Sequence, residues 1–208
     1  MAGSAHLRRT PTQQRSRERV DRILDTAAAI VGAEGIDGLK VSEIARQAGV
    51  PLGTVYQFFA RKDDIVYALA ERFVASFEEV LTGVLTQQDA VPHWRELVDL
   101  LLDTYAEHYR SQPALRELWI DARFDPEFLG ADHEQNNTRF AATVAALMAE
   151  HALVDEQQLT LMVYVTWEAC QALLETAFRA NPDGDAAIIE QTKVLAVRYL
   201  APAFEAGA

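Results

Sequence analysis

The sequence has few of the features that mark secreted or membrane proteins. A single cysteine, Cys170, excludes an intramolecular disulfide. No stretch approaches the roughly 18 consecutive apolar residues that a membrane-spanning helix needs. Residues 1–19 contain basic side chains but no apolar core of a secretory signal. We therefore expect a soluble protein in a reducing compartment, the cytoplasm, with no membrane partner.

Catalytic and metal-binding motifs are also missing from the sequence. The five histidines form no pair spaced i, i+4 and no cysteine–histidine set with zinc spacing. Cys170 lies on an apolar helical face, where a small core residue is expected rather than a nucleophile. We predict that the protein is not an enzyme and has no catalytic residues, no bound metal and no cofactor.

Apolar residues occupy half of the 208 positions and recur mostly with the period of a helix. No alternating apolar run flanked by turn residues predicts a strand. Helices are expected at 16–35, 41–48, 52–59, from 62 onward, at 94–109, from 113, at 140–148, at 159–177 and at 188–200. The sequence therefore predicts an all-α protein with about nine helices.

The charge is divided unevenly along the chain. Basic residues are outnumbered 19 to 31 overall, a net charge of −12. Residues 1–62 nevertheless contain ten basic and six acidic side chains, a net charge of +4, so the remaining 146 residues carry −16. This asymmetry is typical of a small nucleic-acid-binding module joined to a larger acidic body. The alternative to a nucleic-acid-binding module is a solvated basic tail, and residues 1–15 are predicted to form a flexible basic arm.

Two short helices joined by a glycine turn lie between Val41 and Lys62. Gly49 supplies the turn, and the small Ala45 lets the two helices cross closely, as a helix-turn-helix requires. Its apolar underside is expected to comprise Ile44, Val50, Val55 and Phe59. The residues expected to be exposed on the second helix are Leu52, Gly53, Thr54, Tyr56, Gln57 and Phe58.

These residues resemble a known family. Its signature is matched by Glu43-Ile44-Ala45, Ala48-Gly49-Val50 and Gly53-Thr54-Val55-Tyr56-Gln57-Phe58-Phe59, followed by Lys62 and a long helix. The chain is similar here to TetR-type one-component transcriptional regulators, closely over residues 16–75 and only in architecture over 76–208. The resemblance implies a three-helix DNA-binding domain at 16–62, with its motif at about 40–59 and a connecting helix from 62. It implies a larger ligand-binding and dimerisation domain at 63–208.

The resemblance also assigns DNA contacts. Tyr56 and Lys62 resemble the family's phosphate-clamping tyrosine and lysine, and Thr54 resembles a hydroxyl that contacts the DNA backbone. Gly53 lets the second helix approach the groove without a side chain in the way. The predicted DNA-contacting residues are Lys40, Ser42, Leu52, Gly53, Thr54, Tyr56, Gln57 and Lys62.

Two positions depart from the family pattern. Lys40 replaces the hydroxyl residue that usually caps the first helix of the motif, which removes the cap and adds a phosphate contact. Leu52 stands where a polar or basic residue is common, so base readout there is apolar or absent. The preferred operator therefore does not transfer from relatives.

Each of these residues also has an ordinary structural interpretation. Tyr56 fits a core tyrosine with a bonded hydroxyl, Lys62 a solvated lysine, and Ser42 a polar helix residue. Taken singly, the ordinary interpretation is favoured. Taken together, at this spacing and in the basic part of an acidic chain, they favour DNA binding.

The acidic body offers candidates for two further sites. A dimer interface is expected on the last two long helices, because a helix-turn-helix monomer contacts too little DNA for a specific site. Its candidate residues are Val163, Leu174, Ile188, Leu195 and Tyr199, which can equally fill the core of one chain. An apolar pocket for a small molecule is expected near Trp119, Phe140, Trp167 and Gln171.

The sequence thus predicts a homodimeric repressor that binds a double-stranded DNA operator and is released by a small apolar or aromatic effector. One alternative is a helical enzyme or ligand carrier in which the basic arm is incidental. Another is an activator or architectural DNA-binding protein with no ligand. Sequence-dependent DNA affinity separates the first alternative from the prediction, and ligand-induced stabilisation separates the second.

Overall fold

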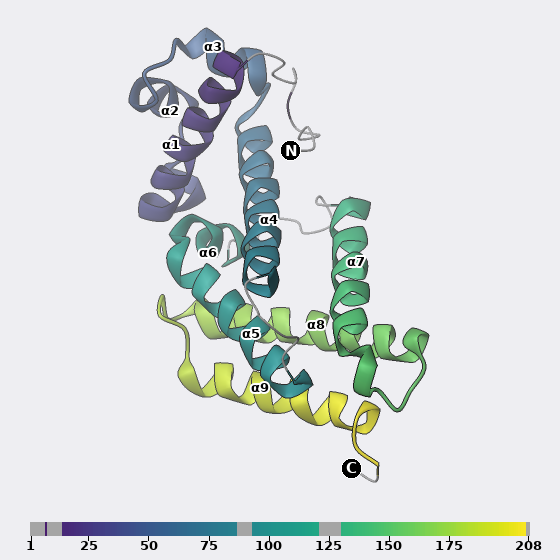
Figure 1. Cartoon of the computed structure of the whole chain (residues 1–208). Coiled ribbons are helices and arrows are strands. Elements are labelled where there is room, and N and C mark those ends of the chain that lie inside the picture. The colour runs from purple at the N-terminus through teal and green to yellow at the C-terminus, as the bar shows by residue number, and fades with distance from the viewer. Residues whose placement is uncertain (1–6, 8–13, 87–92, 121–129, 207–208) are drawn as a thin grey trace. The chain divides into compact units, whose positions relative to one another are not determined.

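The computed structural model describes residues 7, 14–86, 93–120 and 130–206, which are helical almost throughout (Figure 1). Nine α-helices and no strand occur within these ranges, which confirms the predicted all-α class. The helices are α1 (Gln14–Gly38), α2 (Val41–Gln47), α3 (Leu52–Phe58), α4 (Lys62–Thr86), α5 (Trp94–Ser111), α6 (Pro113–Ile120), α7 (Gly130–Met148), α8 (Glu156–Arg179) and α9 (Ala186–Leu200). Apart from residue 7 and the start of α1, the expected basic arm at 1–15 lies outside the described residues.

The chain folds into two compact units. Unit 1 comprises Met1–Glu78 and Gln112–Phe128, and unit 2 comprises Glu79–Ser111 and Leu129–Ala208. This division differs from the boundary expected at residues 62 and 63. Most of α4 and all of α6 belong to unit 1.

In unit 1, α6 packs along α1. The two helices approach closely at Gly32, where an added Cβ would lie 3.3 Å from the Cβ of Pro113 and from the backbone nitrogen of Ala114. The first helical run ends at Gly35, as expected, and a second short helical run follows it within α1. Gly35 has a φ of 70°, and the chain resumes helical geometry as far as Gly38.

Two polar contacts tie α4 to α1 within unit 1. The Lys62 ammonium donates to the Ile36 carbonyl at 2.6 Å, and Arg72 donates to the Asp25 carboxylate at 2.6 Å. At the start of α4, the Asp64 carboxylate accepts the Arg61 backbone N–H at 2.9 Å. An acidic group here also complements the positive end of the helix dipole.

In unit 2, α8 packs against both α7 and α9, and α5 packs against α8 and α9. Aromatic side chains fill the space between α5 and α8. Tyr105 meets Trp167 edge-on, with ring centroids 5.1 Å apart, and Tyr109 stacks on Phe178 at 5.2 Å. Such pairs stabilise a core beyond the apolar area that they bury.

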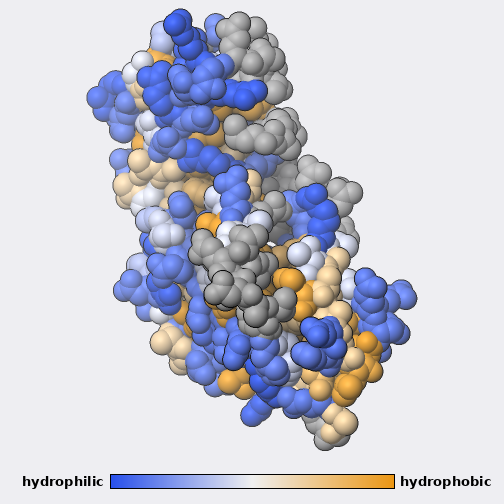
Figure 2. Space-filling view, viewed as in Figure 1, coloured by the Kyte–Doolittle hydropathy of each residue, from blue (hydrophilic) through white to orange (hydrophobic). Residues whose placement is uncertain are grey.

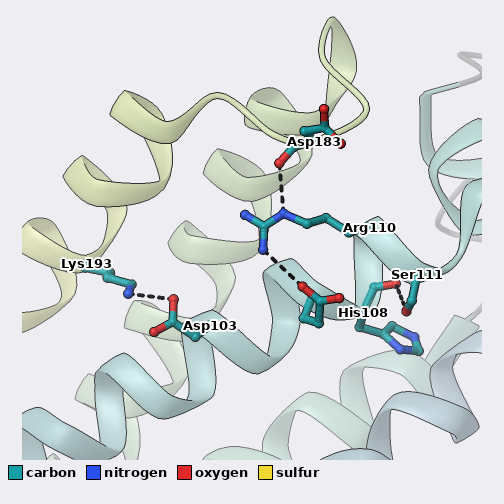
Figure 3. A network of polar contacts seen from close by, with 7 residues as sticks. Asp103, His108, Arg110, Ser111, Asp183 and Lys193 are labelled. Carbon is teal, nitrogen blue, oxygen red and sulfur yellow. Dashed lines mark hydrogen bonds and ion pairs between the residues drawn. The ribbon is translucent and has the colours of Figure 1, made fainter.

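Polar contacts fix α5 to α9 and to the turn between α8 and α9 (Figure 3). Lys193 of α9 pairs with Asp103 of α5 at 2.6 Å. Arg110 of α5 donates to the Asp183 carbonyl at 2.9 Å, which holds the turn onto the end of α5. Unit 2 therefore combines an aromatic interior with polar contacts between helices on its surface.

A turn at 181–184 follows the end of α8 at Arg179. Gly184 is buried and has a φ of 82°, in the left-handed region that favours glycine. An added Cβ would lie 2.8 Å from the ring of Phe178 and 2.8 Å from the Cδ1 of Ile189. The position therefore requires glycine for two independent reasons.

We expect Gly184→Ala to lower the free energy of unfolding by about 2 kcal/mol or more, from left-handed strain and overpacking. Urea unfolding followed by circular dichroism measures the change. Gly83→Ala is the matched control, because Gly83 lies in α4 with no atom within 4 Å of the added Cβ. The control should raise stability by roughly 0.5–1 kcal/mol, so equal effects of the two substitutions would contradict this account.

Candidate nucleic-acid interface and internal cavity

Helices α2 and α3 of unit 1 are joined by a tight turn. Gly49 has a φ of 64°, as its predicted role in the turn requires, and the Val50 N–H donates to the Ala45 carbonyl at 3.0 Å. Ala45 is buried where the two helices cross. Lys40 begins α2 without a side-chain capping bond, as the substitution of the usual hydroxyl predicts.

The short helix α3 has one buried face and one exposed face. Val55 and Phe58 are buried, and Phe59 is buried directly after the helix. The expectation that Phe58 is exposed is therefore wrong, because its ring lies on the same side of α3 as Val55. Leu52 and Tyr56 are each 44% exposed, so Tyr56 is not a core tyrosine.

The remaining predicted contact residues follow the same division. Gly53 and Gln57 of α3 are exposed, and Thr54 is half-buried. Ser42 and Lys40 are exposed on and just before α2. The surface over this part of unit 1 is mainly hydrophilic on the face drawn in Figure 2.

Gly53 lies near the middle of the exposed face of α3. At about 100° per residue, Tyr56 lies about 60° to one side of it and Gln57 about 40° to the other. No atom lies within 4 Å of the position that a Cβ would take at Gly53. The backbone of α3 is therefore open to a close approach by another molecule.

Lys62 is half-buried and is placed differently from an ordinary solvated lysine. Its ammonium reaches across 26 residues of sequence to the Ile36 carbonyl, at 2.6 Å. This carbonyl belongs to the short helical segment after the kink at Gly35. The contact fastens the end of α1 to the start of α4, an intramolecular role that the sequence analysis missed.

An ion pair on α2 was also missed. The Glu43 carboxylate accepts from the Arg46 guanidinium at 2.9 Å and from the Gln47 amide at 2.7 Å. Hydrogen bonding to Arg46, with a smaller contribution from Gln47, lowers the pKa of Glu43 to about 2. The spacing Glu43, Arg46, Gln47 on one helical face is the signal that predicts such a cluster.

Unit 2 contains a small internal cavity of about 30 Å³ between α5, α7, α8 and α9. Its lining side chains are apolar apart from Thr166 and the Cys170 thiol, and Thr166 donates to the Met162 carbonyl at 2.7 Å. Burial raises the pKa of Cys170 to about 12, so the thiol is neutral at physiological pH. The lining residues are Val98, Leu101, Leu102, Phe140, Val144, Met148, Val163, Thr166, Trp167, Cys170, Ala196 and Leu200.

Two of the four predicted pocket residues line this cavity. Phe140 and Trp167 lie side by side there, with ring centroids 4.2 Å apart. Gln171 is not part of the lining and lies 3.5 Å from the Asn137 amide nitrogen. The side chain of Trp119 lies outside the described residues.

A polar cluster joins α7 to α8 beside the cavity wall. Trp167 donates from its indole nitrogen to Asn137 at 3.3 Å, and Asn137 donates to the Glu168 carboxylate at 2.8 Å. Asn137 is buried, so these bonds satisfy an amide that would otherwise be costly to bury. Trp167 therefore both lines the cavity and belongs to this polar cluster.

The predicted dimer residues divide into two groups. Val163 and Leu174 are buried within unit 2, because they lie on the inner face of α8, and are not surface residues. Leu195 and Tyr199 of α9 are more than 40% exposed, and Ile188 is half-buried. Two apolar residues of α8 that the prediction omitted, Leu161 and Val165, are also exposed.

The described part of the chain gives no support for a metal site or for a membrane-spanning helix. Among its residues no group of three or more histidine, cysteine or acidic side chains is placed to hold a metal ion. None of its helices combines the length and apolar character needed to cross a membrane.

Two protein-family profiles match the chain. One, described as "Bacterial regulatory proteins, tetR family", matches residues 23–69 and so includes α2 and α3. The other, described as "Tetracyclin repressor-like, C-terminal domain", matches residues 92–204, more than half of the chain.

Individual relatives agree with these profiles. A solved TetR-family transcriptional regulator from Streptomyces coelicolor is 30% identical, with a TM-score of 0.71 over 91% of this chain and 99% of that one. A solved fatty acid degradation regulator from Bacillus halodurans shares the fold, with a TM-score of 0.63 at 17% identity over 86% of this chain and 94% of that one. The fatty acid metabolism regulator protein of Bacillus subtilis is 35% identical over 66 residues, 32% of this chain and 34% of that protein. The chain thus matches only about a third of this curated relative's length.

We expect Lys62→Met to lower the free energy of unfolding by about 1–2 kcal/mol, because it leaves the half-buried Ile36 carbonyl without its charged donor. Lys40→Met is the control, since the exposed Lys40 makes no capping bond, and its effect should stay within about 0.5 kcal/mol. Urea unfolding of both variants measures the difference. Equal stabilities would show that the contact with Ile36 contributes nothing.

Proposed function

The chain belongs to the TetR family of bacterial transcriptional regulators, and we propose that it is a homodimeric repressor that a small apolar effector releases from its operator. Members of this family are DNA-binding regulators and not enzymes. The observation that carries the proposal is the pairing of an exposed helix-turn-helix in unit 1 with an apolar cavity in unit 2.

The proposed DNA contacts divide by chemistry. Tyr56, Thr54 and Ser42 offer hydroxyl donors to phosphate oxygens, and Lys40 adds a charge next to α2. Leu52 and Gln57 face the bases, with Gly53 between them at the point of closest approach. For Lys62 we propose an indirect contribution, in which its bond to Ile36 holds α1 and α4 in the arrangement that presents α3.

The proposed dimer surface is formed by the exposed faces of α8 and α9, which pack side by side in unit 2. Four apolar side chains there are more than 40% exposed: Leu161, Val165, Leu195 and Tyr199. Hydrophobic residues also gather on the surface near the end of α9 in Figure 2. Exposed apolar groups on neighbouring helices favour burial against a second copy of the chain, with Ile188 at the margin.

The effector is proposed to enter the cavity of unit 2. Ligand pockets usually have volumes of about 300–1,000 Å³, whereas this cavity has about 30 Å³. An effector must therefore push the surrounding helices apart, so it binds an expanded arrangement more tightly than this one. Unequal affinity for two arrangements is what allows a ligand to shift their populations.

Movement in unit 2 has a covalent route to unit 1. Helix α5 lines the cavity and ends at Ser111, and α6 begins two residues later at Pro113. Because α6 packs along α1, a displacement of α5 is transmitted to the helix that supports the DNA-binding motif. A tilt of α4, which contributes residues to both units, is proposed to change the spacing of the two half-sites.

The proposal is tested by capturing sheared genomic DNA of the source organism on the full-length protein at physiological salt and sequencing what is retained. One or a few palindromic sites are expected. Because the proposed operators lie on genomic DNA, we propose that the protein acts in the cytoplasm. Uniform recovery of DNA without a motif would overturn the assignment. Release of the captured site by an effector distinguishes a repressor of this kind from a regulator without a ligand.

We expect Gly53→Ala to weaken operator binding at least about tenfold, because the methyl group stands between the α3 backbone and the groove. The same change should raise the melting temperature, since alanine is the better helix former. Gly83→Ala is the matched control and should raise the melting temperature without changing DNA affinity. Fluorescence anisotropy with a labelled operator measures the affinity of both variants, and circular dichroism measures their melting temperatures. Unchanged affinity of Gly53→Ala would contradict the close approach.

We expect small neutral apolar probes to raise the melting temperature, because the cavity lining carries no charged side chain. Toluene and 1-octanol should stabilise the protein, and the matched anions benzoate and octanoate should not. Val144→Trp fills the cavity and should abolish the shift, whereas Ala142→Trp, on the exposed face of α7, should leave it intact. Stabilisation by the anions alone would contradict the proposed effector class.

A further inference from the structure

The exposed face of α3 carries no charge, and we propose that it reads A·T base pairs, with Leu52 against a thymine methyl group and Gln57 on an adenine. This inference rests on the proposed function, since it requires α3 to lie in the major groove. It adds the chemistry of the operator, on which family membership is silent.

Helix α3 carries no cationic side chain. The helix has the sequence Leu-Gly-Thr-Val-Tyr-Gln-Phe, without arginine or lysine. The commonest specific contact to guanine is an arginine or lysine side chain that donates to its O6 and N7. Guanine readout from this helix would therefore lack its usual donor.

Most of the cations near α3 are engaged within the chain. Arg46 pairs with Glu43, and Lys62 donates to the Ile36 carbonyl at 2.6 Å. Arg61 lies 3.6 Å from the Asp64 carboxylate. An arginine that moves onto a guanine must give up such a partner, which makes it a poor substitute for a cation on α3 itself.

The exposed face of α3 offers an amide and an apolar side chain instead. Gln57 is exposed, and its amide carries a donor and an acceptor in the geometry that matches N6 and N7 of adenine. Leu52 is 44% exposed, and among the four base pairs a methyl group in the major groove is found only on thymine. Contact between the two apolar groups removes both from water.

The spacing of these two side chains along α3 limits the distance between the bases that they contact. Leu52 and Gln57 stand five residues apart, which is about 7.5 Å along the axis of a helix. Base pairs of duplex DNA are stacked about 3.4 Å apart. Because a helix in the major groove runs obliquely to the duplex axis, the thymine and the adenine that they contact should lie within about two base pairs of each other in each half-site. Gly53, between them on the exposed face, lets both side chains reach the bases.

The test begins with selection of binding sites from a random duplex library by the full-length protein. The selected half-sites should share a thymine and an adenine within about two positions of each other. Anisotropy is then measured with two atomic substitutions in the best site. Uracil in place of thymine removes the methyl group, and 7-deazaadenine in place of adenine removes N7.

With the native protein, we expect the uracil substitution to weaken binding about three- to fivefold at one position of each half-site. The 7-deazaadenine substitution should weaken it about fivefold or more at the paired position. Leu52→Ala should abolish the uracil effect and keep the 7-deazaadenine effect, and Gln57→Ala should do the reverse. Tyr56→Phe is the matched control, because it loses one phosphate-directed hydroxyl and should keep both effects.

Circular dichroism verifies that each variant folds; all three changes are on the exposed face of α3. Guanine at the positions under α3, or uracil and 7-deazaadenine effects that persist in Leu52→Ala and Gln57→Ala, would overturn the inference and leave the proposed function intact. Binding to no duplex in the library would overturn both, and the absence of any selected sequence distinguishes that result.

Discussion

The burial of three side chains under α3 is the constraint on which the DNA-binding surface depends. A helix of seven residues is not stable by itself in water, because too few hydrogen bonds offset the cost of nucleation. Val55, Phe58 and Phe59 are each less than 5% exposed, so tertiary packing holds the helix in place. The same packing fixes which side chains face outward. Specificity for DNA therefore rests on a hydrophobic contact that touches no DNA.

The supporting contacts in unit 1 extend this dependence to the rest of the chain. Gly49 sets the angle between α2 and α3, and the Lys62 bond to Ile36 holds the end of α1 against the start of α4. Gly32 allows α6 to pack closely on α1. Each of these positions determines the direction of a helix. Helix α5 lines the cavity of unit 2, and a single residue separates its end from the start of α6. In the proposed function, these few rigid elements couple effector binding to operator binding.

The cavity and the charge distribution suit two different partners. The cavity has about 30 Å³ and no charged lining, so the effector that we propose for it is uncharged and must enlarge it. The +4 net charge of residues 1–62 favours a polyanion, while the −16 of the remaining residues keeps the body off the DNA. On α2 the Glu43–Arg46 pair reduces the local positive charge. Long-range attraction to DNA is therefore expected from residues 1–62 as a whole, and we propose that base selection falls to the uncharged face of α3.

The sequence by itself determined the all-α class, the turn at Gly49, the uncapped start of α2 at Lys40 and membership of the family. These follow from local features, namely helical periodicity, glycine at a left-handed position and a short motif of fixed spacing. Only the tertiary structure decided that Phe58 is buried, that Lys62 binds Ile36 and that Val163 and Leu174 belong to the core. It also decided that Phe140 and Trp167 line the cavity while Gln171 does not, and that α6 packs in unit 1. Periodicity identifies which face of a helix is apolar, but the element that covers this face is set by contacts between residues far apart in the sequence.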